Sequence, residues 1–460
     1  MFKRITNGSV ALVQRLLPDA FIFAIILSIL TLILSMVTTG QSLPALIGHW
    51  GTGFWSLLAF SMQMALVLVL GNAFASSKPV KRFLVKIAGL ARNPGQAIML
   101  VSLVSAIACW LNWGFGLVVG ALLAQELAKR VKGVDYRLLI AAAYSGFVVW
   151  HAGASGSVPL TLASSAEEIS AVTMGALTET IPVSRTLFSP FNLILVWLTI
   201  LTLPLINRAM HPEADQVVAV DPKIIADQEA AELEIEESLS LTRQSMTPAD
   251  RLESSRFLSL FVVVMGVVLL FQHFRTNGFD LNLNIVNFIF LILGVFFHKT
   301  PIRYVRAIEE AVKGAGGILL QFPFYAGIMG MMTGANAEGV SLASQITNFF
   351  LSISNEHTFP MFTFWSAGIV NMFVPSGGGQ WAIQGPIAMP ASVQLGVDPA
   401  ITSMAIAWGD AWTNMLQPFW ALPALGIAKL SAKDIMGYCV MVLLYVGIIV
   451  SIGFLIWGRL

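Results

Sequence analysis

Long apolar runs recur along the chain from residue 18 to residue 457. A helix rises about 1.5 Å per residue, so roughly 20 apolar residues cross the hydrocarbon core of a bilayer. Two regions, 95–129 and 360–395, differ because each has two shorter apolar arms joined by a polar, glycine-rich tip. The remaining runs predict nine transmembrane spans: 18–38, 54–75, 137–164, 187–207, 256–275, 284–297 with its flanks, 316–333, 398–428 and 435–457.

The basic residues give this topology an orientation. If both two-armed regions are re-entrant hairpins, the nine crossings put the N-terminus in the cytoplasm and the C-terminus outside. In that arrangement 23 of the 26 Lys and Arg residues lie on the inner side, and only Arg185, Arg275 and Arg459 lie outside. This agrees with the positive-inside rule. Two full crossings in place of each hairpin would keep the same parity, so charge does not distinguish the two arrangements.

The composition excludes an ordinary soluble enzyme. Only 11% of residues are charged, against about 25% in soluble domains, and the mean hydropathy is +0.78. The net charge of +1 gives no indication of nucleic-acid binding. Cys109 and Cys439 both lie in apolar runs, so the chain has neither a disulfide framework nor a metal-binding spacing. HExxH and GxSxG arrangements are missing at membrane depth, and we expect no enzyme and no cofactor.

One segment looks soluble. Residues 208–255 hold eleven of the 25 acidic residues, clustered in Asp227–Glu237. We interpret the segment as a solvated cytoplasmic linker; a regulatory arm is the alternative. It divides the chain into a first transmembrane repeat (1–207), the acidic linker (208–255), and a linking helix followed by a second transmembrane repeat (256–460).

The two membrane halves have matching hydropathy. A shift of 259 residues lays Asn112 on Asn371, and a shift of 264 lays Tyr144 on Trp408. Each half contains spans, an amphipathic segment, a hairpin, an interrupted span and a further span. Four crossings per repeat plus one linking helix make the second repeat inverted. Many secondary transporters have this design, with the binding site at the midplane between the repeats.

Four polar segments interrupt the apolar pattern. They are Asn112–Gly116, Trp150–Pro159, Asn371–Gln380 and Gly409–Pro418. Irregular backbone at membrane depth is tolerated only where it is buried in protein or lines a watery cavity. Broken helices there expose N–H groups for a carboxylate and carbonyl groups for a small cation. Close helix packing with proline kinks would explain one such segment, but two matched pairs favour a binding site.

Asp410 is the one acid well inside an apolar span, and it sits in the last of these segments. A buried acid costs roughly 2.5–3.5 kcal/mol at a helix centre on insertion scales, which favours a role in binding a cation or proton. The alternative is a neutral, hydrogen-bonded Asp at a helix break. His151 opens the first interrupted span, where it either carries a proton or contacts substrate, or caps the broken helix.

The tryptophans suggest what is bound. Seven of the twelve lie in or beside the four polar segments. There they would line a pocket with apolar surface and indole N–H groups, although an interfacial aromatic belt is the usual explanation for membrane tryptophans. No Lys or Arg lies at these depths. The combination favours a small monoanion with a short apolar tail over a dianion.

At these motifs the chain resembles the bacterial short-chain fatty acid transporters of the AtoE type. The resemblance rests on NWGFGLVVGALLAQELAKR (112–130), GFVVWHAGASGSVPL (146–160), NMFVPSGGGQWAIQGPIAMPA (371–391) and WGDAWTNMLQPFWALPALGI (408–427). It implies uptake of acids such as acetoacetate and butyrate across the cytoplasmic membrane. It also implies membership of the broader ion-transporter superfamily, whose members are typically homodimers with an elevator-type motion.

The prediction is therefore an all-α polytopic membrane transporter with two inverted repeats, each containing a re-entrant helical hairpin and a broken transmembrane helix. It would import short-chain monocarboxylates by H⁺ or Na⁺ symport. A dicarboxylate or other organic-anion transporter and a passive anion channel are the alternatives. Asp410 is the predicted coupling residue, and a sodium ion is expected, if anywhere, near Asn112, Ser155, Asn371 and Asn414. The predicted substrate-binding residues are Asn112, Trp113, Gly114, His151, Ser155, Ser157, Asn371, Ser376, Gly377, Gly378, Gly379, Gln380, Trp412, Thr413, Asn414 and Gln417.

Overall fold

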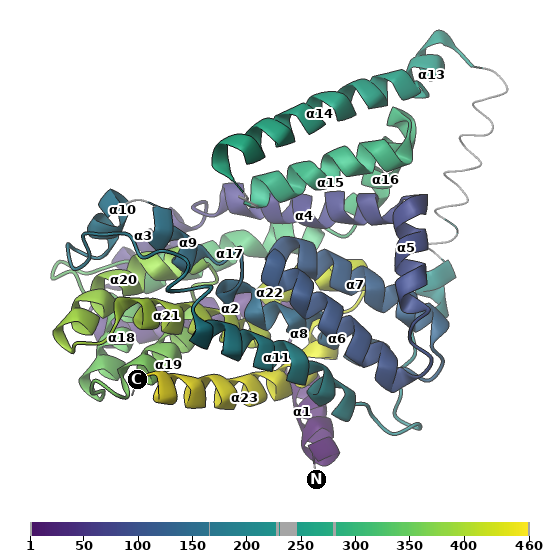
Figure 1. The fold of residues 1–460 in the computed structure, drawn as a ribbon. Helices are drawn as coiled ribbons and strands as arrows, with labels where there is room; N and C mark the ends of the chain where they lie inside the picture. Colours follow the sequence, from purple (N-terminus) through teal and green to yellow (C-terminus); the bar gives the residue numbers. More distant parts are fainter. Residues whose placement is uncertain (1, 165, 227–229, 231–245, 279–281, 459–460) are drawn as a thin grey trace.

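The computed structural model describes residues 2–164, 166–226, 230, 246–278 and 282–458 (Figure 1). Every regular element in these residues is helical, so the predicted all-α class is confirmed. Six helices in the described residues are long and apolar enough to cross a membrane. A seventh candidate is the pair α16 (Pro301–Val312) and α17 (Gly316–Thr333), which is bent by 54°. The chain is thus a polytopic membrane protein.

The first half begins with helices that precede the first hairpin: α1 (Phe2–Leu16), α2 (Ala20–Thr39), α3 (Leu43–Gly53), α4 (Leu58–Ser76) and α5 (Lys78–Ala88). The hairpin arms are α6 (Pro94–Leu111) and α7 (Trp113–Arg130). The interrupted span consists of α8 (Tyr136–Ser145), the 3₁₀ helix η1 (Gly146–Ala152) and α9 (Ser157–Ser164). Two helices complete this half, α10 (Ala166–Val172) and α11 (Pro190–Ala209).

The second half starts with α13 (Pro248–Glu253), α14 (Arg256–Asn277) and α15 (Leu283–His298), followed by α16 and α17. After α18 (Leu342–Ser352), the second hairpin consists of α19 (Phe359–Asn371) and α20 (Gly377–Gln394). The second interrupted span consists of α21 (Pro399–Thr413), the 3₁₀ helix η2 (Asn414–Leu416) and α22 (Pro418–Ala428). The last helix is α23 (Ala432–Trp457). The expected spans therefore all fall on helices or helix pairs.

Local sequence explains where the inner helices begin. α6, α11 and α21 each start at a proline, which costs no hydrogen bond in the first turn. The preceding side chain caps the helix in each case: Asn93 accepts from the Gln96 N–H, Ser189 from Asn192, and Asp398 from Ala400. These caps fix the ends of the elements that carry the polar segments.

The length of α6 does not match the expectation of a short hairpin arm. With 18 residues and high hydropathy, this helix is itself long enough to cross a bilayer. α4, α15 and α22, which lie in expected spans, contain shorter apolar helices instead. Length alone therefore does not decide which helices cross, and the re-entrant hairpins and the nine crossings stay predictions.

The two halves share a pattern of packing partners. α2 and α3 pack on α17, while α15 and α16 pack on α4. In the same way α11 packs on α6 and η1, and α23 packs on α19 and η2. The hairpin arm α7 packs on α22, and α20 packs on α9. Each half thus inserts its hairpin and broken helix beside those of the other half.

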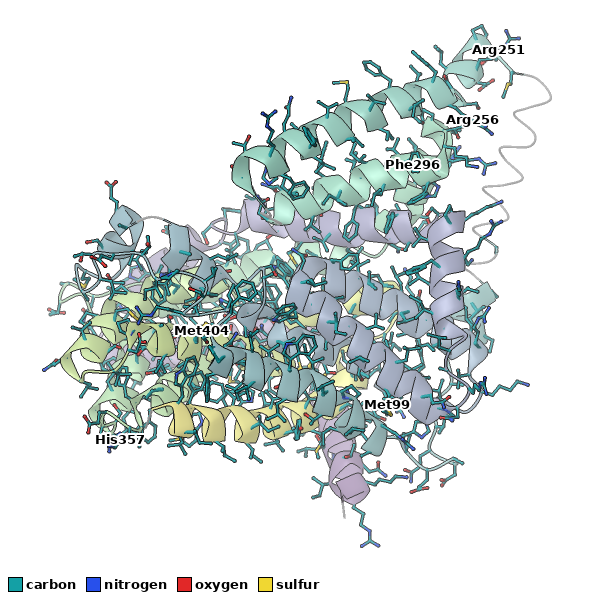
Figure 2. The ribbon with its side chains drawn as sticks, in the orientation of Figure 1. Met99, Arg251, Arg256, Phe296, His357 and Met404 are labelled. Carbon is teal, nitrogen blue, oxygen red and sulfur yellow. The ribbon has the colours of Figure 1, made fainter. Side chains whose placement is uncertain are left out.

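α14 and α15 form an arm at the edge of the molecule (Figure 1). α14 packs mainly on α15, and its apolar side chains, such as Phe257 and Phe261, are largely exposed. Arg251 and Arg256 lie together at one end of the arm, and Phe296 lies on α15 (Figure 2). A helix with exposed apolar side chains along its whole length is suited to contact with lipid.

The first part of the linker contacts the membrane-embedded helices. The Val218 N–H donates to Asp135 Oδ2 (2.9 Å), and the Tyr136 N–H donates to the Val218 carbonyl (2.8 Å). The ammonium of Lys3 lies 2.8 Å from Glu213 Oε1, which holds the pKa of that exposed carboxyl below its usual value. These contacts tie the segment to α1 and to the start of the first broken helix. The acidic cluster Asp227–Glu237 lies outside the described residues except for residue 230.

Candidate functional site

The first broken helix changes from α to 3₁₀ geometry at Gly146, four residues before the predicted break begins at Trp150. η1 continues to Ala152 in 3₁₀ geometry, and the chain is irregular up to the start of α9 at Ser157. The irregular residues are attached to the first hairpin, because the Ala154 N–H donates to the Trp110 carbonyl (2.8 Å). A Cβ at Gly153 would lie 2.2 Å from the same oxygen. Glycine at this position therefore permits the close contact.

The break in the second interrupted span is shorter than predicted. The predicted extent of this break was wrong. Residues 409–413 belong to α21, so only Asn414–Gln417 interrupt the span, and Trp412 and Thr413 are still α-helical. Gly409 does not break the helix. A Cβ there would lie 2.4 Å from the Phe364 carbonyl, so this glycine lets α21 pack closely on α19. Asp410 consequently projects from a regular helix rather than from an unwound segment.

The first hairpin tip also has fewer non-helical residues than predicted. Only Asn112 is non-helical, and Trp113–Gly116 form the first turn of α7. Asn112 Oδ1 caps this helix by accepting from the Phe115 N–H (3.0 Å). Ser155 Oγ, from the first break, accepts from the Trp113 N–H (3.1 Å). Asn112, Trp113 and Ser155 are thereby brought together, and Gly114 is buried in the same turn.

The second hairpin tip is longer. Residues 372–376 are not helical, and Ser376 Oγ caps α20 by accepting from the Gly379 N–H (3.2 Å). Gly377 packs against His151, since a Cβ there would lie 2.6 Å from His151 Cε1. A Cβ at Gly378 would meet nothing within 4 Å. The start of α20 therefore lies directly on the first broken helix, with open space at its second residue.

His151 and Asp410 form a buried pair between the two broken helices. His151 Nδ1 lies 2.8 Å from Asp410 Oδ2, and neither side chain is more than 1% exposed. The other ring nitrogen, Nε2, accepts from the Val158 N–H (3.1 Å). Because a backbone N–H can only donate, a neutral His151 must carry its proton on Nδ1 and donate it to Asp410. The pair places a carboxylate acceptor at the centre of the molecule.

Asn371 connects the second hairpin to the second break. Its Nδ2 group lies within 2.9 Å of three acceptors, the Asp410 carbonyl, Thr413 Oγ1 and Asn414 Oδ1. Gln417 Nε2 donates to the Asn371 carbonyl. All of these side chains are buried. Asp410, Thr413, Asn414 and Gln417 are thus held in one hydrogen-bonded cluster around Asn371.

Several buried polar atoms of this cluster have no hydrogen-bond partner among the described residues. Three are oxygens: Asp410 Oδ1, Asn371 Oδ1 and Gln417 Oε1. One is a donor group, Asn414 Nδ2, and the indole nitrogen of Trp150 beside His151 is another. Leaving such groups unpaired costs about 1–3 kcal/mol each. Together these atoms offer hydrogen-bond donors to an anionic group and oxygen ligands to a cation.

Aromatic rings form one wall of this site. Trp150 stacks on His151 with ring centroids 4.2 Å apart, and Phe147 stacks on Trp150 at 5.6 Å. Trp420 lies 5.4 Å from Trp113 and 5.2 Å from Phe147. This wall combines residues from both halves and supplies apolar surface. Phe147 was not predicted as a site residue, because a phenylalanine in an apolar run carries no sequence signal.

Two further aromatic residues brace the breaks across the halves. The Tyr144 hydroxyl, on α8, donates to the Asn414 carbonyl in the second break (2.6 Å). Trp408, on α21, donates to Asn192 Oδ1 (2.9 Å), and Asn192 Nδ2 donates to the Ala152 carbonyl at the end of η1 (3.2 Å). The shift of 264 residues that relates the two halves lays Tyr144 on Trp408. This match was the sequence signal that could have suggested equivalent bracing roles for the two residues.

Two predicted residues lie in other contacts. Gln380 Nε2 donates to the Ala367 carbonyl and to Gln384, so Gln380 joins the two arms of its hairpin. Trp412 donates to the Leu443 carbonyl of α23 and packs on Phe364. Ser157 starts α9, and Gly379 lies in the first turn of α20. Among the described residues, no group of three or more His, Cys, Asp and Glu side chains lies together.

The fold and this site define an all-α polytopic membrane protein with a polar centre built from two hairpin tips and two broken helices. A family model for short chain fatty acid transporters matches residues 1–457. The chain therefore belongs to the short chain fatty acid transporter family, and its resemblance to that family is confirmed. Membership indicates a transport role rather than catalysis.

Two relatives agree with this assignment. A candidate short-chain fatty acid transporter of Escherichia coli strain K12 is 46% identical over 453 residues, which covers 98% of this chain and 99% of that protein. A protein of Haemophilus influenzae strain Rd with the same description is 43% identical over 455 residues, with the same coverage.

Two solved structures resemble the chain more distantly. The YdaH transporter of Alcanivorax borkumensis gives a TM-score of 0.42 at 17% identity, covering 96% of this chain and 98% of that one. MtrF of Neisseria gonorrhoeae, described as one of a class of antimetabolite efflux pumps, gives 0.37 at 15% identity, covering 100% and 97%. With TM-scores below 0.5, neither likeness carries an argument about this chain.

Proposed function

We propose that this protein imports short-chain monocarboxylates, such as acetoacetate or butyrate, across the bacterial cytoplasmic membrane by symport with H⁺ or Na⁺. The observation that carries the proposal is the buried His151–Asp410 pair, which lies against the tip of the second hairpin. One oxygen of its carboxylate has no hydrogen-bond partner in the described part of the chain. Family membership supplies the substrate class.

The chemistry of the site suits a monoanion with a short tail. The N–H groups at the start of α20, Asn414 Nδ2 and the Trp150 indole would donate to the substrate carboxylate. Trp150, Phe147 and Trp420 would pack on the alkyl tail. The hydrogen-bonded cluster holds neither Lys nor Arg, whose fixed charge a dianion would favour. Neutral donors are sufficient for one negative charge.

Electrostatic repulsion explains why a cation would be needed. A substrate carboxylate about 5 Å from an ionised Asp410, at an effective dielectric constant of about 20, is destabilised by roughly 3 kcal/mol. That corresponds to a factor of roughly 200 in affinity. A cation bound at Asp410 Oδ1 removes this penalty, so each ligand raises the affinity for the other.

Both coupling ions are compatible with the donor set. A proton would neutralise Asp410 directly. A sodium ion would take the three unpartnered oxygens of Asp410, Asn371 and Gln417, since hard cations prefer oxygen ligands. Asn112 Oδ1 and Ser155 Oγ already accept helix N–H groups, so the second hairpin's cluster offers more free oxygens than the first tip.

The larger architecture is part of the same proposal. The shared packing partners support two inverted repeats, 1–207 and 256–460, with α14 as the linking helix and the N-terminus in the cytoplasm. The hairpins and broken helices would move together as an elevator against the remaining helices, in a homodimer.

Counterflow in proteoliposomes tests the function. Vesicles preloaded with unlabelled butyrate should take up labelled butyrate transiently above equilibrium. Excess external acetoacetate should compete, and succinate should not. Competition by succinate would indicate a dicarboxylate transporter. Passive equilibration without an overshoot, and without accumulation in imposed sodium or pH gradients, would indicate an anion channel and contradict the proposal.

A further inference from the structure

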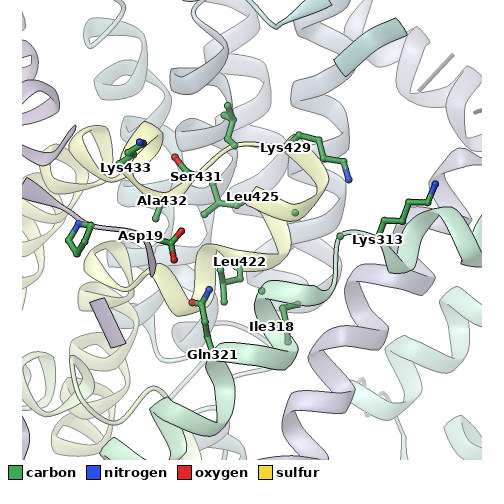
Figure 3. Close-up of a pocket in the computed structure, with 15 residues that line it drawn as sticks. Asp19, Lys313, Ile318, Gln321, Leu422, Leu425, Lys429, Ser431, Ala432 and Lys433 are labelled. Atoms are coloured by element: carbon green, nitrogen blue, oxygen red, sulfur yellow. The ribbon is translucent and has the colours of Figure 1, made fainter. Parts of the chain in front are cut away.

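A cavity lies at the opposite end of α22 from the Asn371 cluster. Its volume is about 390 Å³, within the range of small-molecule sites. It lies where α17, α22 and α23 meet the start of α2 (Figure 3). Ile318, Leu422 and Leu425 form apolar walls, and Gln321 and Ser431 add polar groups. The cavity thus combines apolar surface with a polar side.

The charged side chains at its edge are mostly positive. Lys313, Lys429 and Lys433 line it, together with one acid, Asp19, whose carboxylate caps α2. Lys313 pairs with Glu310. Within the described part of the chain, the ammonium groups of Lys429 and Lys433 have neither a hydrogen bond nor an ion pair. They are therefore available to an anion.

Gln321 is the buried polar group of the cavity. Its side chain is only 6% exposed, and its amide oxygen Oε1 has no hydrogen-bond partner among the described residues. It lies in the second turn of α17, beside Gly317 of the first turn. The amide N–H₂ of Gln321 can donate to an anion. A buried amide with an unpaired oxygen aimed into a cavity indicates a ligand.

Lys429 has an unusual backbone for its residue type. It ends α22 in the left-handed conformation, with φ 56° and ψ 37°, where glycine is the usual residue. A lysine there is strained. Lys429 places a positive charge at this edge of the cavity.

We propose that this cavity binds the carboxylate of the transported acid on the cytoplasmic side, as a second station on the exit route. The identity of the acid rests on the proposed function. α22 connects the two places, because its first end follows Gln417 and its last two turns line the cavity. Its 11 residues correspond to about 16 Å.

An aromatic barrier separates the station from the central site. Phe322, the residue after Gln321, stacks on Phe419, with ring centroids 4.0 Å apart. Tyr325 lies edge-on to Phe419 at 5.0 Å. All three side chains are fully buried. Transfer past these rings therefore requires them to move apart.

A reporter in the cavity wall tests the proposal. Leu422→Cys should react with a membrane-impermeant maleimide in inside-out vesicles of neutral lipid, whereas the native Cys109 and Cys439 are buried. Butyrate should protect the reporter. Adding Lys429→Gly and Lys433→Gln should raise the protecting butyrate concentration about 3- to 10-fold, because two partly solvated charges are lost.

Lys299→Gly is the matched control. Lys299 also ends a helix with positive φ (68°) but does not line the cavity. Both glycine variants should relieve strain and leave the fold intact, and only Lys429→Gly should weaken protection.

Three results would each overturn the assignment. They are equal protection by inorganic phosphate, dependence of protection on anionic lipid, and no effect of the Lys429 and Lys433 changes. If wild type transports butyrate and the reporter is unprotected, this inference alone fails. If the reporter is protected but wild type does not transport butyrate, the proposed function fails instead.

Discussion

His151 Nδ1 and Asp410 Oδ2 lie 2.8 Å apart, although 259 residues separate them in the sequence. The contact joins the 3₁₀ segment of the first broken helix to a regular helix of the second. Its surroundings contain the tip of the second hairpin and carboxylate and amide oxygens that have no partner within the described residues. Under the proposed function, this contact places the coupling group against the substrate-binding surface.

Gly377→Ala should abolish transport with little loss of expression. The new Cβ would lie 2.6 Å from His151 Cε1, so the tip or the ring must move and the His151–Asp410 contact is disturbed. Gly378→Ala is the matched control, because its Cβ would meet nothing within 4 Å. Initial rates of labelled butyrate uptake measure both. Equal activity of the two variants would show that close packing of the tip on His151 does not matter.

Tyr144→Phe should destabilise the protein by about 1 kcal/mol, because the buried Asn414 carbonyl loses its donor. Transport should fall as well, since the second break loses its brace. Tyr325→Phe is the control. The Tyr325 hydroxyl is buried and has no hydrogen-bond partner among the described residues, so its removal should be neutral or stabilising. Thermal unfolding of the purified variants in detergent gives the comparison. A smaller loss for Tyr144→Phe than for Tyr325→Phe would contradict the bracing role.

Cysteines at Trp113 and Ser376 test whether the hairpins re-enter the membrane. Both positions lie at buried or half-buried tips. Each cysteine should react slowly, only from the side on which its hairpin enters, and substrate should protect it. Rapid labelling of residue 113 from outside, or of residue 376 from inside, in a non-transporting state would instead indicate full crossings.

Much of the fold could be predicted because hydropathy alone sets it. Each expected span lies on a helix, and the two glycine-rich regions form paired helices around Asn112 and Ser376. The extent of the breaks could not be predicted in the same way. Gly409 resembles a helix breaker in sequence, yet it permits a backbone contact with Phe364 in a continuous helix. A glycine alone does not tell a break from a close helix contact.

The site was predicted residue by residue but not as pairs. Asp410 stood out because a lone acid in an apolar span is costly. Its partner His151 lies on another element, and only long-range packing brings the two together. Trp412 and Gln380 were predicted to bind substrate because polar or aromatic side chains in these segments suit a binding site. In the structure, Trp412 donates to α23 and Gln380 donates to the other arm of its own hairpin. Orientation around a helix axis depends on neighbours that sequence does not reveal.

Asp410→Asn in proteoliposomes tests the central claim most directly. The change keeps the size and hydrogen-bonding shape of the side chain and removes its charge. Gradient-driven accumulation of labelled butyrate should fall steeply, whereas exchange at equal butyrate concentrations on both sides should survive. Glu126→Gln, which alters a buried acid paired with Lys129 on α7, should leave accumulation unchanged. Accumulation by Asp410→Asn at the wild-type rate, with wild-type sodium and pH dependence, would show that Asp410 is not the coupling site.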